Sequence, residues 1–336
     1  MKIGVDLMGG DNAPEAIVSG VQLALKKYQN IDFVLFGRQE ELENVLHKHK
    51  LLHEKRVSLV DAPQVVKMDD NSAIALRAKK NSSISIAVSY MKDGKIDAVV
   101  SAGHTGAAVA SSVVKMRTLP NIDRPGIATI FPSPTGPFVL LDAGANVDAK
   151  SEHLVQYAIM GEIYAKYILG RENPRIGILS IGEEEEKGNE LTKKTLKELN
   201  KLPINFIGNV EGSDLFENKI DVVICDGFVG NIVLKTSESL AKSLSRILKK
   251  LLKKTPVRLA GALLSQNAFK ELKRLSDHAE YGGAPLLGIN GTCIIAHGSS
   301  SPKAIMNAIR VAKEFIQHDI NHRITKRWEA VNTIEN

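Results

Sequence analysis

The sequence is poor in cysteine and in aromatic residues. Its two cysteines, Cys225 and Cys293, lie in apolar runs, and neither has a second cysteine or a histidine at metal-ligand spacing. A disulfide scaffold and a zinc site are therefore not expected. Phenylalanine, tryptophan and tyrosine together make up only 5% of the 336 residues. That fraction argues against a protein that stacks on nucleic-acid bases or binds sugars in an aromatic cleft.

Long hydrophobic runs are also missing. Two stretches of 17 residues carry no formal charge, Ala98 to Val114 and Pro125 to Leu141. The first contains a histidine, two glycines and four Ser/Thr residues, and the second contains four prolines, so neither is expected to span a bilayer as a helix. Asp6 interrupts the first apolar run too early for a secretion signal. We therefore expect the chain to stay in the reducing cytoplasm.

The common phosphate-binding and nucleophile fingerprints are absent as well. The chain has no G-x-x-x-x-G-K-[ST] loop and no G-x-G-x-x-G after its first apolar run. It also lacks a G-x-S-x-G nucleophile elbow. A nucleoside-triphosphate enzyme and a standard dinucleotide-binding enzyme are therefore not indicated.

Short apolar runs rich in Val and Ile alternate with helical stretches along the chain. This alternation is typical of a mostly parallel sheet with helices on both faces, so the predicted fold class is α/β. We expect residues 1–330 to form a single large domain, with two fused lobes as the alternative. The expected strands are Ile3–Asp6, Asp32–Phe36, Val57–Val60, Ala98–Ser101, Gly126–Phe131, Phe138–Asp142, Arg175–Ser180 and Val222–Cys225.

A polar turn that contains glycine follows an apolar run six times. The six turns are Asp6–Asp11, Ser101–Gly106, Asp142–Asn146, Ile181–Glu183, Asp226–Asn231 and His297–Pro302. In a parallel sheet such turns gather at the carboxyl ends of the strands, where glycine lets backbone approach a ligand and helix starts present free N–H groups to an anion. Each glycine alone is explained as well by a tight turn. Their number predicts a phosphate-binding cleft.

The net charge of +6 is concentrated in one segment. Residues 239–270 contain no acid and eight Lys or Arg residues, whereas the rest of the chain is slightly acidic. Leucine and isoleucine repeat at helical spacing from Leu240 to Leu252, and Thr255-Pro256 ends this pattern before a second apolar stretch. We therefore predict a basic amphipathic helical hairpin at residues 238–275.

The predicted hairpin has three candidate uses. Its apolar stripe could pack against a second subunit, its tip could enter an anionic membrane surface, and its cations could attract an acidic protein. We favour the first two together, with the stripe in a dimer and the tip on the membrane. The residues expected to contact the membrane or the acidic protein are Lys249, Lys250, Lys253, Lys254, Arg258, Leu259 and Leu263.

Four motifs resemble those of the bacterial phosphate acyltransferase family. They are Asp6–Pro14, Gly182–Asn189, Cys225–Asn231 and Tyr281–Gly288, and the similarity extends to about Trp328. The resemblance implies a three-layer α/β/α sandwich related to phosphotransacetylases and to isocitrate and isopropylmalate dehydrogenases, acting as a homodimer. It also implies transfer of a fatty acyl group from acyl carrier protein to inorganic phosphate. The resulting acyl phosphate would feed phospholipid synthesis at the inner face of the cell membrane, with no metal and no cofactor.

Candidate site residues follow from the turns and from these motifs. His104 stands where the family usually has an asparagine, so it either replaces an amide donor or acts as a catalytic imidazole. Lys187 follows four glutamates and either binds phosphate or only balances those acids. The predicted catalytic residues are Lys187, Asn231, Asp226 and His297. The predicted phosphate or substrate ligands are Asp6, Gly9, Gly10, Ser72, Arg77, Gly103, His104, Thr105, Asn146 and Asn189.

Two other classes of function remain open on the sequence alone. A different enzyme of the phosphotransacetylase-like fold, such as an acetyl-transferring or decarboxylating enzyme, would need a coenzyme A pocket or a metal-binding aspartate cluster, and the sequence has no convincing cluster. A nonenzymatic basic protein is the other class, and its support is limited to the cations between Lys242 and Lys270. We expect no nucleic-acid partner, because this segment has no nucleic-acid-binding motif and no interleaved aromatic residues.

Overall fold

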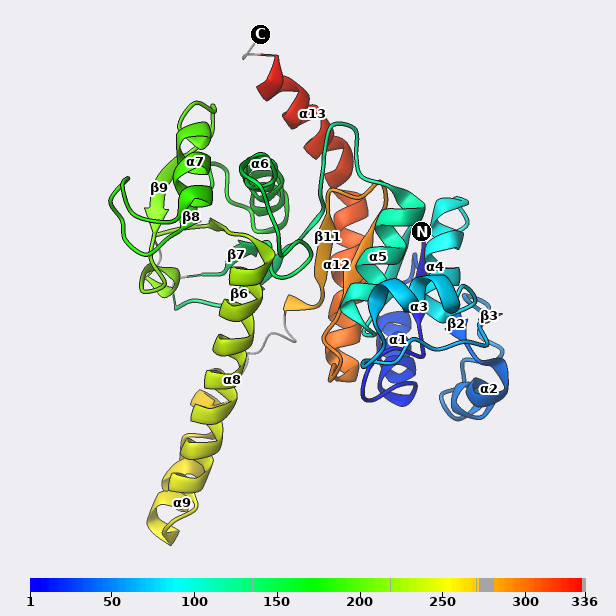
Figure 1. The fold of residues 1–336 in the computed structure, drawn as a ribbon. Coiled ribbons are helices and arrows are strands. Elements are labelled where there is room, and N and C mark those ends of the chain that lie inside the picture. Colours follow the sequence, from blue (N-terminus) through cyan, green and yellow to red (C-terminus); the bar gives the residue numbers. More distant parts are fainter. Residues whose placement is uncertain (135, 218, 270, 272–280, 334–336) are drawn as a thin grey trace.

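The strands are divided between two sheets. A computed structural model describes residues 1–134, 136–217, 219–269, 271 and 281–333 (Figure 1). The first sheet has seven strands in the order β3-β2-β1-β4-β12-β11-β5, and the second has five in the order β6-β7-β10-β8-β9. Most neighbouring strands are parallel, and the exceptions are β11 and β5 in the first sheet and β6 in the second. The α/β prediction with mostly parallel strands is therefore confirmed.

The bounds of the strands agree with the predicted runs at most positions. The first sheet contains β1 (Lys2–Asp6), β2 (Asp32–Gly37), β3 (Val57–Asp61), β4 (Ala98–Ser101), β5 (Gly126–Ile127), β11 (Ala284–Leu287) and β12 (Cys293–Ile295). The second contains β6 (Thr129–Phe131), β7 (Phe138–Leu141), β8 (Ile176–Leu179), β9 (Phe206–Val210) and β10 (Val222–Ile224). The sequence did not predict β9, β11 and β12.

Helices cover both faces of the first sheet because its strands are apolar on both sides. On β2, Phe33 and Leu35 belong to one core and Val34 and Phe36 to another. The helices that pack in the first core are α1 (Glu15–Lys27), α2 (Gln39–Lys48) and α12 (Pro302–Gln317), and those in the second are α4 (Ser83–Lys92) and α5 (Thr105–Met116). The short helix α3 (Ser72–Ala78) contacts α5.

The second sheet has the same three-layer construction. On β10, Val222 and Ile224 pack in the core beneath α6 (Ser151–Ile168), α7 (Glu190–Leu199) and α13 (Ile320–Asn332). Val223 points to the other face, where a smaller core includes Phe138 and residues from the start of α8 (Gly227–Leu252). A 3-10 turn at Asp214–Phe216 closes this face.

One extended stretch connects the two sheets. The sequence predicts a single strand at Gly126–Phe131, but its first half pairs with β11 in the first sheet and its second half with β7 in the second. The backbone N–H of Ile127 donates to the buried carboxylate of Asp142 at 2.9 Å. The run is extended throughout, as predicted, and it changes partners at Ala128.

Helix α8 extends from the second sheet into an arm that projects from the body (Figure 1). The arm ends at α9 (Pro256–Leu264), where the side chain of Thr255 accepts from the backbone N–H of Arg258 at 3.3 Å. The predicted break at Thr255-Pro256 is therefore the start of a new helix. Residues 270 and 272–275 of the predicted hairpin lie outside the described residues. Within the described chain, no helix has the length and apolar character required to cross a membrane.

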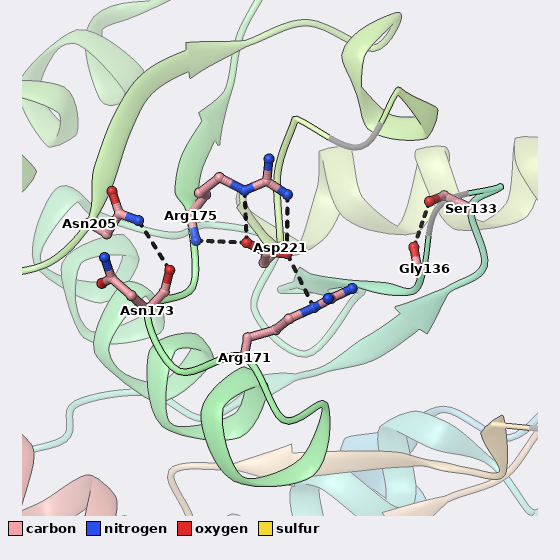
Figure 2. Close-up of polar contacts among 7 residues, drawn as sticks. All are labelled: Ser133, Gly136, Arg171, Asn173, Arg175, Asn205 and Asp221. Carbon is pink, nitrogen blue, oxygen red and sulfur yellow. Dashed lines mark hydrogen bonds and ion pairs between the residues drawn. The ribbon is translucent and has the colours of Figure 1, made fainter.

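A shared carboxylate holds the amino ends of β8 and β10 together (Figure 2). Asp221 accepts from the backbone N–H and from Nε of Arg175, both at 2.9 Å, and Arg171 Nε lies 3.3 Å from its other oxygen. Beside them, Asn205 donates to the carbonyl of Asn173 at 3.1 Å, and Ser133 donates to the carbonyl of Gly136 at 2.5 Å. Burial alone would raise the pKa of Asp221, but the hydrogen bonds and charge of Arg175, together with the charge of Arg171, lower it below its ordinary value.

Replacing this carboxylate should destabilise the fold in a pH-dependent way. We expect Asp221→Asn to lower the free energy of unfolding by about 2 kcal/mol at pH 7, because charge-assisted hydrogen bonds are lost. Since the pKa is lower in the folded state, the stabilisation is complete above the unfolded pKa of about 3.9 and is lost as the pH falls below it. Urea unfolding of both proteins between pH 7 and pH 3 measures this difference.

A matched control is Asp93→Asn, which removes a carboxylate from an exposed pair with Lys95. Its effect should stay below about 0.5 kcal/mol at every pH. An equal loss of stability in the Asp221 variant at pH 7 and pH 3 would contradict the proposed origin of the effect.

Candidate active site

A cleft of about 440 Å³ lies between the carboxyl edges of the two sheets. One side is formed by the turns after β4 and β12, and the other by the turn after β7 and the first turns of α8. The β5–β6 stretch and the residues around the start of β11 join the two sides. Its lining comprises Met68, His104–Gly106, Ile127, Thr129, Ile130, Ala143, Gly144, Asn231, Leu234, Lys235, Glu238, Tyr281–Ala284 and Ile295–His297.

A buried carboxylate organises the turns of the first sheet. Asp6 is 2% exposed and accepts from Ser101 Oγ at 2.7 Å and from the backbone N–H of Met8 at 3.1 Å. Ser101 Oγ in turn accepts from the N–H of Gly103 at 3.1 Å. Burial raises the pKa of Asp6 above its ordinary value, although these bonds oppose the shift. The carboxylate thus holds the turn, and Asp6 is not among the residues that line the cleft.

The glycines of these turns permit a close approach of backbone to backbone. A Cβ on Gly9 would lie 2.6 Å from Cα of Gly103, and one on Gly10 would lie 2.8 Å from the carbonyl oxygen of Gly298. Gly10 also has φ +104, which favours glycine. The predicted ligands Gly9, Gly10 and Gly103 are therefore brought together, and their tight packing explains why glycine is needed there.

A second buried carboxylate performs the same task in the other sheet. Asp142 accepts backbone N–H bonds from Ile127, Gly144, Ala145 and Asn146 at 2.7–2.9 Å. It is fully buried, and burial raises its pKa above the ordinary value even though these four bonds oppose the shift. Asp142 was not among the predicted site residues. Its signal was the same as that of Asp6, an aspartate at the end of an apolar run followed by a glycine turn.

The first turn of α8 packs against this carboxylate. A Cβ on Gly227 would lie 2.7 Å from Asp142 Oδ2, and Gly230 packs on the Asp142 carbonyl. Asp226 caps the helix by accepting from the N–H groups of Phe228 and Val229, both at 2.9 Å. Asn231 follows one turn later and lines the cleft beside Gly144. The predicted catalytic Asp226 is thus engaged in the cap, whereas Asn231 is at the cleft.

The two predicted histidines lie on the first-sheet side of the cleft. His104 caps α5, and its Nδ1 accepts from the backbone N–H of Ala107 at 3.2 Å. His297 Nδ1 accepts from the N–H of Ser299 at 3.1 Å, while its Nε2 lies 3.6 Å from Glu238 Oε2. Thr105 follows His104 in the lining of the cleft.

Two charged residues of α8 that face this cleft were not predicted from the sequence. Lys235 Nζ lies 3.5 Å from Glu238 Oε2, and Glu238 is mostly buried, with 12% of its side chain exposed. Both lie on the face of α8 that carries Asn231, four and seven residues further along the helix. Their helical spacing from the predicted Asn231 was the signal by which the sequence could have indicated them.

Other predicted residues lie outside the lining of the cleft. Lys187 is exposed and follows β8, and Asn189 caps α7 by accepting from the N–H of Thr192 at 2.9 Å. Asn146 Nδ2 lies 3.2 Å from His153 Nδ1. Ser72 packs against Gly106 at the start of α5, and Arg77 is exposed in the last turn of α3. Lys187, Asn189 and Asn146 still share the carboxyl edge of the second sheet, because β8 and β7 both flank β10 in parallel.

Comparison with known proteins places nearly the whole chain in one family. The family model described as fatty acid synthesis protein matches residues 1–323. A phosphate acyltransferase of Desulfitobacterium hafniense (strain DSM 10664 / DCB-2) is 50% identical over 327 residues, which cover 97% of both chains. A phosphate acyltransferase of a Nitratiruptor species is 47% identical over 332 residues, which cover 98% of both chains.

Solved structures show the same fold at much lower identity. A phosphotransacetylase from Streptococcus pyogenes matches with a TM-score of 0.60 and 18% identity, over 94% of each chain. The fold is therefore that of the phosphotransacetylases, which confirms the predicted architecture. With identity near one half over almost its full length, the chain belongs to the phosphate acyltransferase family.

Proposed function

We propose that the protein transfers a fatty acyl group from the thioester of acyl carrier protein to inorganic phosphate, giving an acyl phosphate for phospholipid synthesis. The observation that carries this proposal is the cleft between the two sheets. It combines glycine turns and helix starts, which suit an anion, with the apolar side chains of Met68, Ile127, Ile130, Leu234 and Ile295, which suit an acyl chain. Family membership supports the reaction class.

The chemistry requires positioning more than acid or base catalysis. Phosphate is largely dianionic near neutral pH, since its relevant pKa resembles the value of about 6 of a phosphate monoester, and it is already nucleophilic. The thiol that leaves has an ordinary pKa of about 8.5, so it departs as a fairly stable thiolate. The protein must hold phosphate against the thioester carbonyl and stabilise the oxyanion that develops.

The residues of the cleft supply groups for both tasks. The amide of Asn231 and the imidazole of His104 come from opposite sides and serve as donors to the reacting oxygens. Thr105 and the N–H groups at the start of α5 favour an anion there, with Ser72 packed beside them. His297 is paired with Glu238 and organises the rim. Lys187 acts from the loop after β8, which lies at the same sheet edge as Asn231.

The carboxylates Asp6 and Asp142 position the turns without contacting substrate. Asp226, Asn146 and Asn189 do the same through the helix caps and loop contacts described above. Gly9, Gly10 and Gly103 provide the space that the turns need to meet. Arg77 contributes positive charge from α3 and attracts phosphate. No step in this scheme requires a metal or a cofactor.

The arm formed by α8 and α9 is proposed to bring the enzyme to its lipid and protein partners. Its exposed apolar residues include Leu240, Leu244 and Ile247 along α8, and Leu259 and Leu263 in α9. The stripe on α8 suits packing against a second copy of the chain, in a homodimer. The α9 tip and the cations Lys249, Lys250, Lys253, Lys254 and Arg258 suit an anionic membrane surface and the acidic acyl carrier protein.

The proposed reaction is tested by incubating the purified protein with a long-chain acyl-carrier-protein thioester and phosphate. We expect acyl phosphate and free thiol in equal amounts, both dependent on added phosphate. A thioester of coenzyme A, supplied in place of the acyl-carrier-protein thioester, identifies the donor. Thiol release without added phosphate would indicate hydrolysis, and equal or better use of the coenzyme A thioester would overturn the proposed donor.

Lys187 should matter for turnover and not for folding. We expect Lys187→Ala to lower kcat/KM by about 10²-fold, as for the loss of one electrostatic contact to a developing charge. The exposed side chain should contribute less than about 0.5 kcal/mol to the free energy of unfolding. Lys193→Ala, at an exposed site on neighbouring α7, is the matched control. Normal turnover in the Lys187 variant would remove this residue from the site.

Neutralising the arm should weaken membrane binding. We expect replacement of Lys249, Lys250, Lys253 and Lys254 by glutamine to reduce co-sedimentation with anionic vesicles, since each cation near such a surface contributes about 1 kcal/mol. The difference should disappear at high salt. Glutamine at Lys193, Lys194, Lys197 and Lys201 changes the net charge equally and should leave vesicle binding intact. Unchanged binding of the arm variant would contradict its role.

A further inference from the structure

His104 has one ring nitrogen committed to the backbone. It occupies the N-cap position of α5, and its Nδ1 accepts from the N–H of Ala107 at 3.2 Å. An imidazole nitrogen that accepts a hydrogen bond carries no proton, so the neutral ring holds its proton on Nε2. The helix cap therefore fixes the tautomer of His104.

The second ring nitrogen of His104, Nε2, takes no part in the helix cap. His104 lines the cleft, and within the described chain Nε2 has no hydrogen-bond partner. Glycine at position 106 leaves room for the ring, because a Cβ there would lie 3.2 Å from His104 Cε1. A neutral N–H donor is thus fixed at the surface of the cleft, next to the positive end of the α5 dipole.

His297 lies on the same side of the cleft as His104, but the surroundings of its Nε2 differ. Its Nδ1 also accepts from a backbone N–H, that of Ser299 at 3.1 Å, so its proton also lies on Nε2. That nitrogen, however, faces Glu238 Oε2 at 3.6 Å. A carboxylate therefore faces Nε2 of His297, whereas among the described residues no carboxylate lies against Nε2 of His104.

We infer that His104 is a neutral hydrogen-bond donor to an anionic oxygen of the reacting pair, and that it transfers no proton. This inference rests on the proposed function. In the reaction a phosphate oxygen forms a bond to the carbonyl carbon, and the carbon–sulfur bond breaks with its electron pair on sulfur. The thiolate takes its proton from solvent, and Nε2–H remains intact throughout. The oxygen that it contacts is either the thioester oxyanion or an oxygen of phosphate.

Three substitutions of His104 separate its role as a hydrogen-bond donor in the cleft from its role as the N-cap of α5. Asn, Ser and Asp all cap helices well, so each should preserve the start of α5. Asn capping through its carbonyl oxygen also leaves an N–H₂ group facing outward, much as Nε2–H does. Ser is neutral but too short to place a second donor at that point, and Asp replaces the donor with a negative charge. Urea unfolding is measured first, to check that the variants have the same stability before their rates are compared.

The expected rates follow from the presence or absence of the donor. We expect His104→Asn to lower kcat/KM by less than about tenfold, and His104→Ser to lower it by about 10²-fold, the cost of one lost oxyanion donor. His104→Asp should lose at least as much as His104→Ser. A fall in kcat assigns the donor to the oxyanion, and a rise in KM for phosphate assigns it to phosphate. Wild-type turnover in His104→Ser would overturn the inference.

A proton-transferring imidazole would give a different pattern. His104→Asn would then lose as much activity as His104→Ser, and its pH–rate profile would lack a limb that the wild type shows. Either result overturns the inference while leaving the proposed function intact. If the wild-type protein forms no acyl phosphate, the proposed function fails, and the donor role falls with it.

The tautomer can be measured without any turnover. We expect ¹⁵N NMR of the full-length protein with ¹⁵N-labelled histidine to show the Nε2-protonated tautomer for the resonance that disappears in His104→Asn. Addition of inorganic phosphate should shift that resonance if phosphate is the oxygen contacted. A ring protonated on Nδ1 at neutral pH, as the other tautomer or as imidazolium, would overturn the inference.

Discussion

Two buried aspartates hold the cleft in shape, and the rest of the site depends on them. Asp6 ends β1 and Asp142 follows β7, and each accepts hydrogen bonds from the backbone of the turn that it begins. Such a carboxylate satisfies several N–H groups that would otherwise be buried without partners. Because Asp142 also holds Ile127, it fixes the stretch that joins the two sheets as well as the turn after β7. The two sides of the cleft are therefore set by the same kind of interaction.

Much of this arrangement could be predicted from the sequence because its physical causes are local. An apolar run that ends in an aspartate and a glycine predicts a strand followed by a turn, and the structure confirms this at Asp6 and at Asp142. The unpredicted strands lack such signals. β11 contains Pro285, which argues against a strand, and β12 is only three residues long. Their positions are fixed by pairing with distant strands, which no local pattern encodes.

The site was predictable to the extent that its residues lie at strand ends. His104, Thr105 and His297 lie in the turns directly after strands, Asn231 lies in the first turns of the helix that follows β10, and the structure brings all four to one cleft. Glu238 lies further along the same helix, so its signal was its spacing from Asn231 and not a strand end, and its role depends on the approach of His297 from the other sheet. Asp226 and Asn189, by contrast, were predicted as site residues but do not line the cleft. Both stand in motif turns, yet their side chains cap helices.

Helix α8 links the chemistry of the cleft to the arm. Its first turns carry Asn231, Leu234 and Glu238 into the cleft, and its continuation carries the apolar stripe that begins at Leu240. The helix is unbroken from Gly227 to Leu252, and at 1.5 Å per residue the distance along its axis from Glu238 to Leu252 is roughly 21 Å. Under the proposed function, a rigid rod of this length would hold the cleft at a fixed height above the surface on which the α9 tip rests.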